Sequence, residues 1–220
     1  MALNPMFQVG LDVRGRICLV IGGDGVAQDK VERLLDAGAR VVVISPEVTP
    51  RLRDCATDPC RLEWRQRHYE SEDLDGAFLV MNTIRGNSDL CRRVFSEAGA
   101  QGILVNTYDD VDHSHFGMVA LVSAGHLRLG VSTSGASPTL AGRLRQDLDG
   151  MFDEEFGEYL EALGCARASL REAVPDFPAR REILQGLVAG VHVEGRCHLP
   201  EGWRERITAA LAAAGTKKTG

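Results

Sequence analysis

The chain has 220 residues, enough for one large domain or for one domain with an appendage. Hydrophobic residues make up 44% and charged residues 25%, which excludes a disordered chain, and no apolar run approaches the length of a membrane span. The net charge of −6 disfavours nonspecific nucleic-acid binding, and the N-terminal residues lack the basic and apolar regions of a signal peptide. We therefore expect a cytoplasmic protein with no nucleic-acid or membrane partner.

The chain opens with a predicted βαβ unit. An apolar run at 16–21 ends in Gly22-Gly23 and predicts a buried strand. Apolar residues at helical spacing follow up to Gly38, and the run 41–44 predicts a second buried strand. A strand, a glycine turn, a helix and a strand within about 30 residues require a parallel sheet.

The alternation of strands and helices continues to about residue 112. Further strands are predicted around 62–64, at 77–81 and at 103–105, with a helix between the last two. Residues 1–112 are therefore expected to form a Rossmann-like, doubly wound α/β domain with a parallel sheet.

The pattern then changes to a hairpin and helices. Two apolar runs, 116–122 and 127–131, are joined by four residues, which suits a hairpin rather than a crossover. Ser137 is a suitable N-cap and Pro138 a suitable first helical residue for the helix that follows.

The rest of the chain is predicted to be helical. One long helix carries Phe156 to Leu170, a shorter one spans 184–188, and a last one spans 203–211. We divide the chain into an α/β domain, a hairpin segment, a helical C-terminal domain and a disordered tail. Their bounds are 1–112, 113–150, 151–214 and 215–220.

The first candidate motif is the glycine turn from Gly22 to Ala27. A dinucleotide site needs a glycine for the tight turn, a second where the backbone approaches the pyrophosphate, and a small residue for packing. Gly22 and Ala27 suit the first and third roles, whereas Asp24 stands at the second unless the turn is shifted to Gly25. The alternative is a glycine-rich turn that binds no nucleotide.

Polar residues follow the second and fifth strands, where ligands bind in open α/β sheets. Ser45 and Glu47 are candidates for ribose hydroxyls, with a plain strand-end turn as the alternative. Asp109 and Asp110 follow the fifth strand and suggest a general base or a metal ligand, with a solvated turn as the alternative.

Together these segments resemble the siroheme synthase family, which carries precorrin-2 dehydrogenase activity with or without sirohydrochlorin ferrochelatase activity. The matching segments lie at 22–30, 34–39, 45–47, 73–80, 102–110 and 132–141. The segment Ser-x-Ser-Gly-Ala-Ser-Pro at 132–138, placed after a hairpin, is the most specific of them.

The resemblance implies that residues 1–112 are an NAD-binding domain and that residues 113–150 are a dimerisation segment. It implies a homodimer that oxidises precorrin-2, a tetrapyrrole, to sirohydrochlorin with NAD+, and in some members inserts Fe2+. It places the catalytic aspartate on Asp109. The cofactor contacts that it implies are Gly22, Gly23, Asp24, Gly25, Val26, Ser45, Pro46 and Glu47. We add Thr83 and Asn106, two polar residues at the ends of strands, as further candidates for cofactor binding.

The substrate that the resemblance implies is a polycarboxylate, so we expect cationic and hydroxyl side chains around it. The candidates are Arg128, Thr133, Ser134 and Arg143, with Arg145 and Arg85 as further cations. Asp109, His113 and His115 are the candidate ligands of an incoming metal ion.

The sequence departs from the family at two places on the cofactor side. Asp24 replaces a glycine, and Ile84-Arg85 replaces two aspartates after Thr83. The alternatives to the dehydrogenase are therefore a chelatase without the redox step and a non-catalytic tetrapyrrole-binding paralogue. No methyltransferase domain is expected in this chain.

Overall fold

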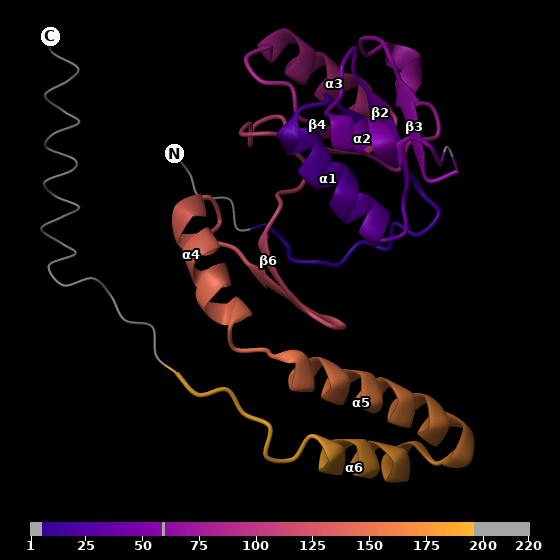
Figure 1. Cartoon of the computed structure of the whole chain (residues 1–220), viewed down its shortest axis with the longest axis vertical. Coiled ribbons are helices and arrows are strands. Elements are labelled where there is room, and N and C mark those ends of the chain that lie inside the picture. The colour runs from indigo at the N-terminus through magenta and orange to yellow at the C-terminus, as the bar shows by residue number, and fades with distance from the viewer. Residues whose placement is uncertain (1–5, 59, 196–220) are drawn as a thin grey trace, which may run out of the picture. The chain divides into compact units, whose positions relative to one another are not determined.

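A computed structural model describes residues 6–58 and 60–195 (Figure 1). The chain divides into two compact units between Gly157 and Glu158. The helix predicted at 203–211 and the tail predicted at 215–220 lie outside the described residues. Within the described part, no helix is both long and apolar enough to cross a membrane.

A five-stranded parallel sheet forms the centre of the first unit. Its strand order is β3-β2-β1-β4-β5, so the chain winds outward from β1 in both directions. The strands are β1 (Ile17–Ile21), β2 (Arg40–Ile44), β3 (Leu62–Arg65), β4 (Leu79–Asn82) and β5 (Leu104–Thr107). The predicted doubly wound α/β fold is confirmed.

Alternate residues of each strand pack against helices on opposite faces of the sheet, as the pleat requires. Val20 of β1 packs in one hydrophobic cluster with Val31, and Leu19 of β1 packs in the other with Val94. Helices α1 (Gly25–Asp36) and α2 (Pro50–Cys55) contribute to the first cluster. Helix α3 (Ser88–Ala100) and the 3₁₀ turn η1 (Ser71–Leu74) contribute to the second.

Polar caps determine where the helices begin. Asp24, Thr49 and Asn87 each accept a backbone N–H in the first turn of α1, α2 and α3. Because each capping residue comes shortly after a strand, the helices begin at the carboxyl edge of the sheet.

A two-stranded antiparallel hairpin and a helix complete the first unit. Strands β6 (Ala120–Ala124) and β7 (Leu127–Val131) pair from Ala120↔Val131 to Ala124↔Leu127. The predicted four-residue connection is wrong, because the ladder continues to a two-residue turn at Gly125-His126, where Gly125 has φ of 54°. Helix α4 (Pro138–Asp149) begins at the predicted residue, with Ser137 as its cap.

Helices α5 (Glu154–Ala173) and α6 (Phe177–Leu187) follow. In the second unit, the Tyr159 hydroxyl donates a hydrogen bond to the Leu187 carbonyl at 2.8 Å. The prediction of a short helix at 184–188 is wrong about where the helix begins. Helix α6 already begins at Phe177, because Asp176 caps it and a proline occupies its first turn.

Candidate cofactor and substrate site

The glycine turn after β1 is shaped by close packing at two of its three glycines. Gly22 has φ of 119°, and a Cβ there would lie 2.2 Å from the Thr83 Oγ1. A Cβ on Gly23 would lie 2.0 Å from the Glu47 carbonyl oxygen. A Cβ on Gly25 would meet nothing within 4 Å, so the start of α1 opens onto free space.

This open side of the turn presents unpaired amides. Among the described residues, the N–H groups of Gly23, Asp24 and Gly25 have no hydrogen-bond acceptor. Consecutive free N–H groups at the start of a helix bind phosphate well. The turn therefore fits the diphosphate of a dinucleotide.

Asp24 adds a negative charge at this point. Its Oδ1 accepts hydrogen bonds from the amides of Val26 (3.0 Å) and Ala27 (3.1 Å). The carboxylate thus takes up two of the amides that would otherwise face a diphosphate.

The loop after β2 packs onto the glycine turn. The buried Ser45 hydroxyl donates to the Glu47 carbonyl at 2.6 Å, and the Thr49 amide donates to the Gly23 carbonyl at 3.0 Å. The Glu47 side chain is exposed, so its carboxylate can accept hydrogen bonds from ribose hydroxyls. Pro46 is also exposed and can contact a ligand.

The loop after β4 brings a cation to Asp24. The Thr83 side chain is buried and donates to the Ile21 carbonyl at 2.9 Å, so it holds the turn together. Arg85 Nη2 lies 3.8 Å from Asp24 Oδ2, and the Arg85 guanidinium lies 4.9 Å from the centre of the Tyr108 ring.

The segment after β5 exposes Asp109. Asp109 has φ of 57°, and among the described residues its side chain has no hydrogen-bond or ion-pair partner. The side chain of Asn106, in β5, has a partner within the protein. Its Nδ2 donates a hydrogen bond to the Phe116 carbonyl at 2.8 Å, which links β5 to the segment that leads to the hairpin.

Asp109 and Ser134 (φ 52°) are the only non-glycine residues of the described part with φ in the left-handed region. Such conformations are strained and cluster at functional sites. The sequence predicts both as site residues, Asp109 for catalysis and Ser134 for substrate binding.

The two candidate metal-ligating histidines have other partners. His113 Nδ1 lies 2.7 Å from Asp110 Oδ2, and His115 Nδ1 accepts the Val105 amide at 3.1 Å. Both rings also pack against Phe95. No group of three or more His, Cys, Asp or Glu side chains that could hold a metal ion occurs in the described part of the chain. Asp109, His113 and His115 are therefore not gathered into a metal site.

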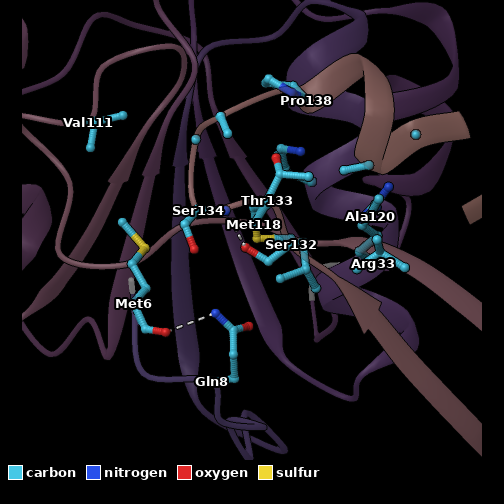
Figure 2. A pocket seen from close by; sticks show the side chains of 18 residues that line it. Met6, Gln8, Arg33, Val111, Met118, Ala120, Ser132, Thr133, Ser134 and Pro138 are labelled. Atoms are coloured by element: carbon cyan, nitrogen blue, oxygen red, sulfur yellow. Dashed lines mark hydrogen bonds between the residues drawn. The ribbon is translucent and has the colours of Figure 1, made fainter. Parts of the chain in front are cut away.

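A cavity of about 570 Å3 lies within the first unit, between α1 and the hairpin with α4. Figure 2 shows Ser132, Thr133 and Ser134 gathered in its wall beside Met118. The predicted residues Thr133 and Ser134 thus lie together in one cavity.

Two cationic side chains in the cavity wall, Lys30 and Arg33, were not among the site residues predicted from the sequence. They lie three residues apart on α1 and so share one helix face. The signal was present, because a lysine follows the glycine turn within the family-like segment at 22–30.

The predicted arginines do not line this cavity. Arg128 Nη1 donates to the Gly125 and Leu127 carbonyls at the hairpin turn. Arg143 pairs with Asp147 at 3.1 Å and Arg145 with Asp149 at 3.4 Å, both along α4. The guanidinium groups of these three arginines therefore bind to groups of their own hairpin turn or helix.

Comparison with known proteins gives three kinds of match. The family model described as "Putative NAD(P)-binding" matches residues 9–120. The siroheme synthase of Xylella fastidiosa is 30% identical over 190 residues, covering 86% of this chain and 40% of that protein. The siroheme synthase of Photorhabdus laumondii is 32% identical over 177 residues, covering 80% and 37%. The chain thus spans about two-fifths of the length of these relatives.

Among solved structures, the one titled "SirC, precorrin-2 dehydrogenase" is similar to the chain. It matches with a TM-score of 0.68 at 25% identity and covers 84% of this chain and 90% of that one. The likeness therefore extends beyond the parallel sheet.

Proposed function

The chain belongs to the siroheme synthase family through its NAD(P)-binding domain, and we propose that it oxidises precorrin-2 to sirohydrochlorin with NAD+ as the hydride acceptor. Its part in siroheme biosynthesis is supported by curated relatives and by the structure titled precorrin-2 dehydrogenase. Since the chain spans only part of those relatives, the reaction itself is our proposal.

The observation that carries the proposal is the open start of α1. Among the described residues, the backbone N–H groups of Gly23, Asp24 and Gly25 have no acceptor, and a Cβ added at Gly25 would project into open space with no atom within 4 Å. They would hold the diphosphate, and Glu47 would accept hydrogen bonds from a ribose. When bound there, NAD+ supplies the acceptor for a hydride.

The cavity is the proposed binding site for the tetrapyrrole. Lys30 and Arg33 provide cations for its carboxylates, and Thr133 and Ser134 provide hydroxyl groups. Hydride loss leaves a proton to be removed, and the exposed, unpaired Asp109 carboxylate would accept it. The substrate then loses one hydride and one proton in total.

An absorbance assay tests the reaction. Purified protein should convert precorrin-2 to sirohydrochlorin when NAD+ is added and should not convert it without NAD+. A matched reaction with NADP+ identifies the preferred cofactor. If precorrin-2 is bound but unchanged with either cofactor, the protein is a tetrapyrrole-binding protein and not a dehydrogenase.

A second candidate function is insertion of Fe2+ into sirohydrochlorin. The observation that favours it is Asp24, whose carboxylate occupies two amides of the dinucleotide site while Asp109 remains free as a base for pyrrole protons. The test is the absorbance change of sirohydrochlorin with Fe2+ and without NAD+. A chelatase without the redox step would show this change and no binding of NAD+.

We further propose that the protein is a homodimer that associates through the hairpin unit. A two-stranded sheet alone is marginal in water, and α4 covers this one only in part, since β6 and β7 contribute a single buried residue, Val122. Met118 and Leu140 remain 42% and 49% exposed beside it. A second copy would cover these apolar side chains.

A further inference from the structure

We propose that Arg85 neutralises Asp24 and thereby lets the start of α1 accept a diphosphate. The inference rests on the proposed dinucleotide site, and it concerns two residues from separate loops. Asp24 belongs to the turn after β1, and Arg85 belongs to the turn after β4. Their side chains meet with Arg85 Nη2 at 3.8 Å from Asp24 Oδ2.

Asp24 alone would oppose a bound diphosphate. Its Oδ1 is held by the amides of Val26 and Ala27, so the carboxylate is fixed at the start of the helix. A negative charge about 4 Å from a phosphate lowers affinity by roughly fivefold in water-like surroundings and by up to about a thousandfold at an effective dielectric near 20. A site with Asp24 therefore needs a nearby cation.

Arg85 is held where that cation is needed. The turn that carries it is fixed at both ends, because Thr83 donates to the Ile21 carbonyl and Asn87 caps α3. The guanidinium also lies 4.9 Å from the centre of the Tyr108 ring, which follows β5. Three strand ends of the sheet therefore position one arginine beside the glycine turn.

The exposure and the length of this ion pair favour a role in ligand binding over a role in folding stability. Arg85 and Asp24 are 59% and 54% exposed, and exposed ion pairs contribute little to stability. At 3.8 Å the contact is also longer than a hydrogen bond, and among the described residues Arg85 donates to no acceptor. Its guanidinium N–H groups thus remain available to phosphate oxygens while its charge offsets that of Asp24.

A double-mutant cycle on the full chain tests the pairing. The variants are Arg85→Gln, Asp24→Asn and the two together, because asparagine preserves the helix cap. The measurement is the dissociation constant of NAD+ by calorimetry, with unfolding temperature as the check on folding. Arg92→Gln is the matched control, because Arg92 is an exposed arginine on α3 that pairs with Asp89.

We expect Arg85→Gln to weaken NAD+ binding at least tenfold when Asp24 is present, and about threefold or less when it is combined with Asp24→Asn. Asp24→Asn and Arg92→Gln should leave affinity within about threefold, and all four variants should keep the wild-type unfolding temperature. Equal losses on both backgrounds would overturn the pairing and leave the NAD+ site intact. Binding that appears only in Asp24→Asn would also overturn it. No NAD+ binding in any variant would instead refute the proposed cofactor, and this inference with it.

Discussion

Lys30 Nζ lies 2.9 Å from Asp29 Oδ2, and the Lys30 side chain is only 14% exposed in the wall of the cavity. The other oxygen of Asp29 accepts Arg33 Nε at 3.0 Å, so one carboxylate orients both cavity cations. Burial raises the pKa of Asp29, but the hydrogen bond and charge of Lys30 and the charge of Arg33 outweigh it, and the net pKa is lowered. Asp29 therefore stays charged at neutral pH.

Replacing Lys30 should weaken binding of the polycarboxylate substrate. We expect Lys30→Gln to raise the KM for precorrin-2 roughly tenfold with little change in kcat, because a charged hydrogen bond to a substrate carboxylate contributes about 1.5–3 kcal/mol. Steady-state kinetics provides the measurement. Arg51→Gln, which removes an exposed α2 cation that pairs with Glu32, should leave both constants unchanged. An unchanged KM in Lys30→Gln would place the substrate elsewhere.

Two glycine substitutions should separate folding from cofactor binding. Gly23→Ala should lower the unfolding temperature, because its Cβ would lie 2.0 Å from the Glu47 carbonyl oxygen. Gly25→Ala should leave stability unchanged and weaken NAD+ binding several-fold, because its Cβ would enter the space assigned to the diphosphate. Thermal unfolding and calorimetry measure the two effects. Full NAD+ affinity in Gly25→Ala would mean that the diphosphate does not lie there.

Asp109 should be required for turnover but not for folding. We expect Asp109→Asn to reduce kcat at least a hundredfold, since a general base contributes about 10²–10⁴. Asparagine tolerates the left-handed conformation at φ of 57°, so the unfolding temperature should not change. Asp112→Asn, at a nearby exposed aspartate, is the matched control. Wild-type turnover in Asp109→Asn would remove this carboxylate from the mechanism.

Asp73 should make stability depend on pH at the acid end. Its side chain is 1% exposed and accepts hydrogen bonds from Arg65, Arg67 and the Glu70 amide. Burial raises its pKa, but these hydrogen bonds outweigh burial and the net pKa is lowered.

A lowered pKa in the folded state means that the stabilisation is present above the unfolded pKa of about 4 and is lost as pH falls through the folded pKa. Asp73→Asn should cost about 3 kcal/mol at pH 7 and flatten the stability profile below pH 5. Urea unfolding at several pH values measures both effects. The exposed Asp75→Asn should retain the wild-type profile, and a similar loss in both variants would contradict the role of Asp73.

The proposed dimer should depend on the apolar surface of the hairpin unit. Sedimentation at micromolar concentration should give a species of twice the chain mass, and Leu140→Glu should shift it to the monomer without unfolding α4, where Leu140 is 49% exposed. An active wild-type monomer would refute the dimer.

Elements whose signals are local could be predicted from the sequence. Apolar runs and helical spacing identified β1, α1 and β2, and Ser137-Pro138 marked the start of α4. The short helix α2 was missed because six residues carry too little periodicity, and the hairpin turn was misplaced because cross-strand pairing extends β6 to Ala124.

Contacts between residues of separate loops could not be predicted in this way, because they depend on how the strands are ordered in the folded sheet. Both Asp24 and Arg85 stood out in the sequence as departures from a family pattern, but 61 positions of chain separate them and no local rule connects them. They come to 3.8 Å because β1 and β4 are neighbours in the parallel sheet, so the turns after both strands leave the same edge. Conversely, Asp109, His113 and His115 lie close together in the sequence, but no group of three or more His, Cys, Asp or Glu side chains in the described part of the chain is arranged to hold a metal ion. The partners of a polar side chain depend on which strand ends are adjacent, and strand order is a property of the whole sheet.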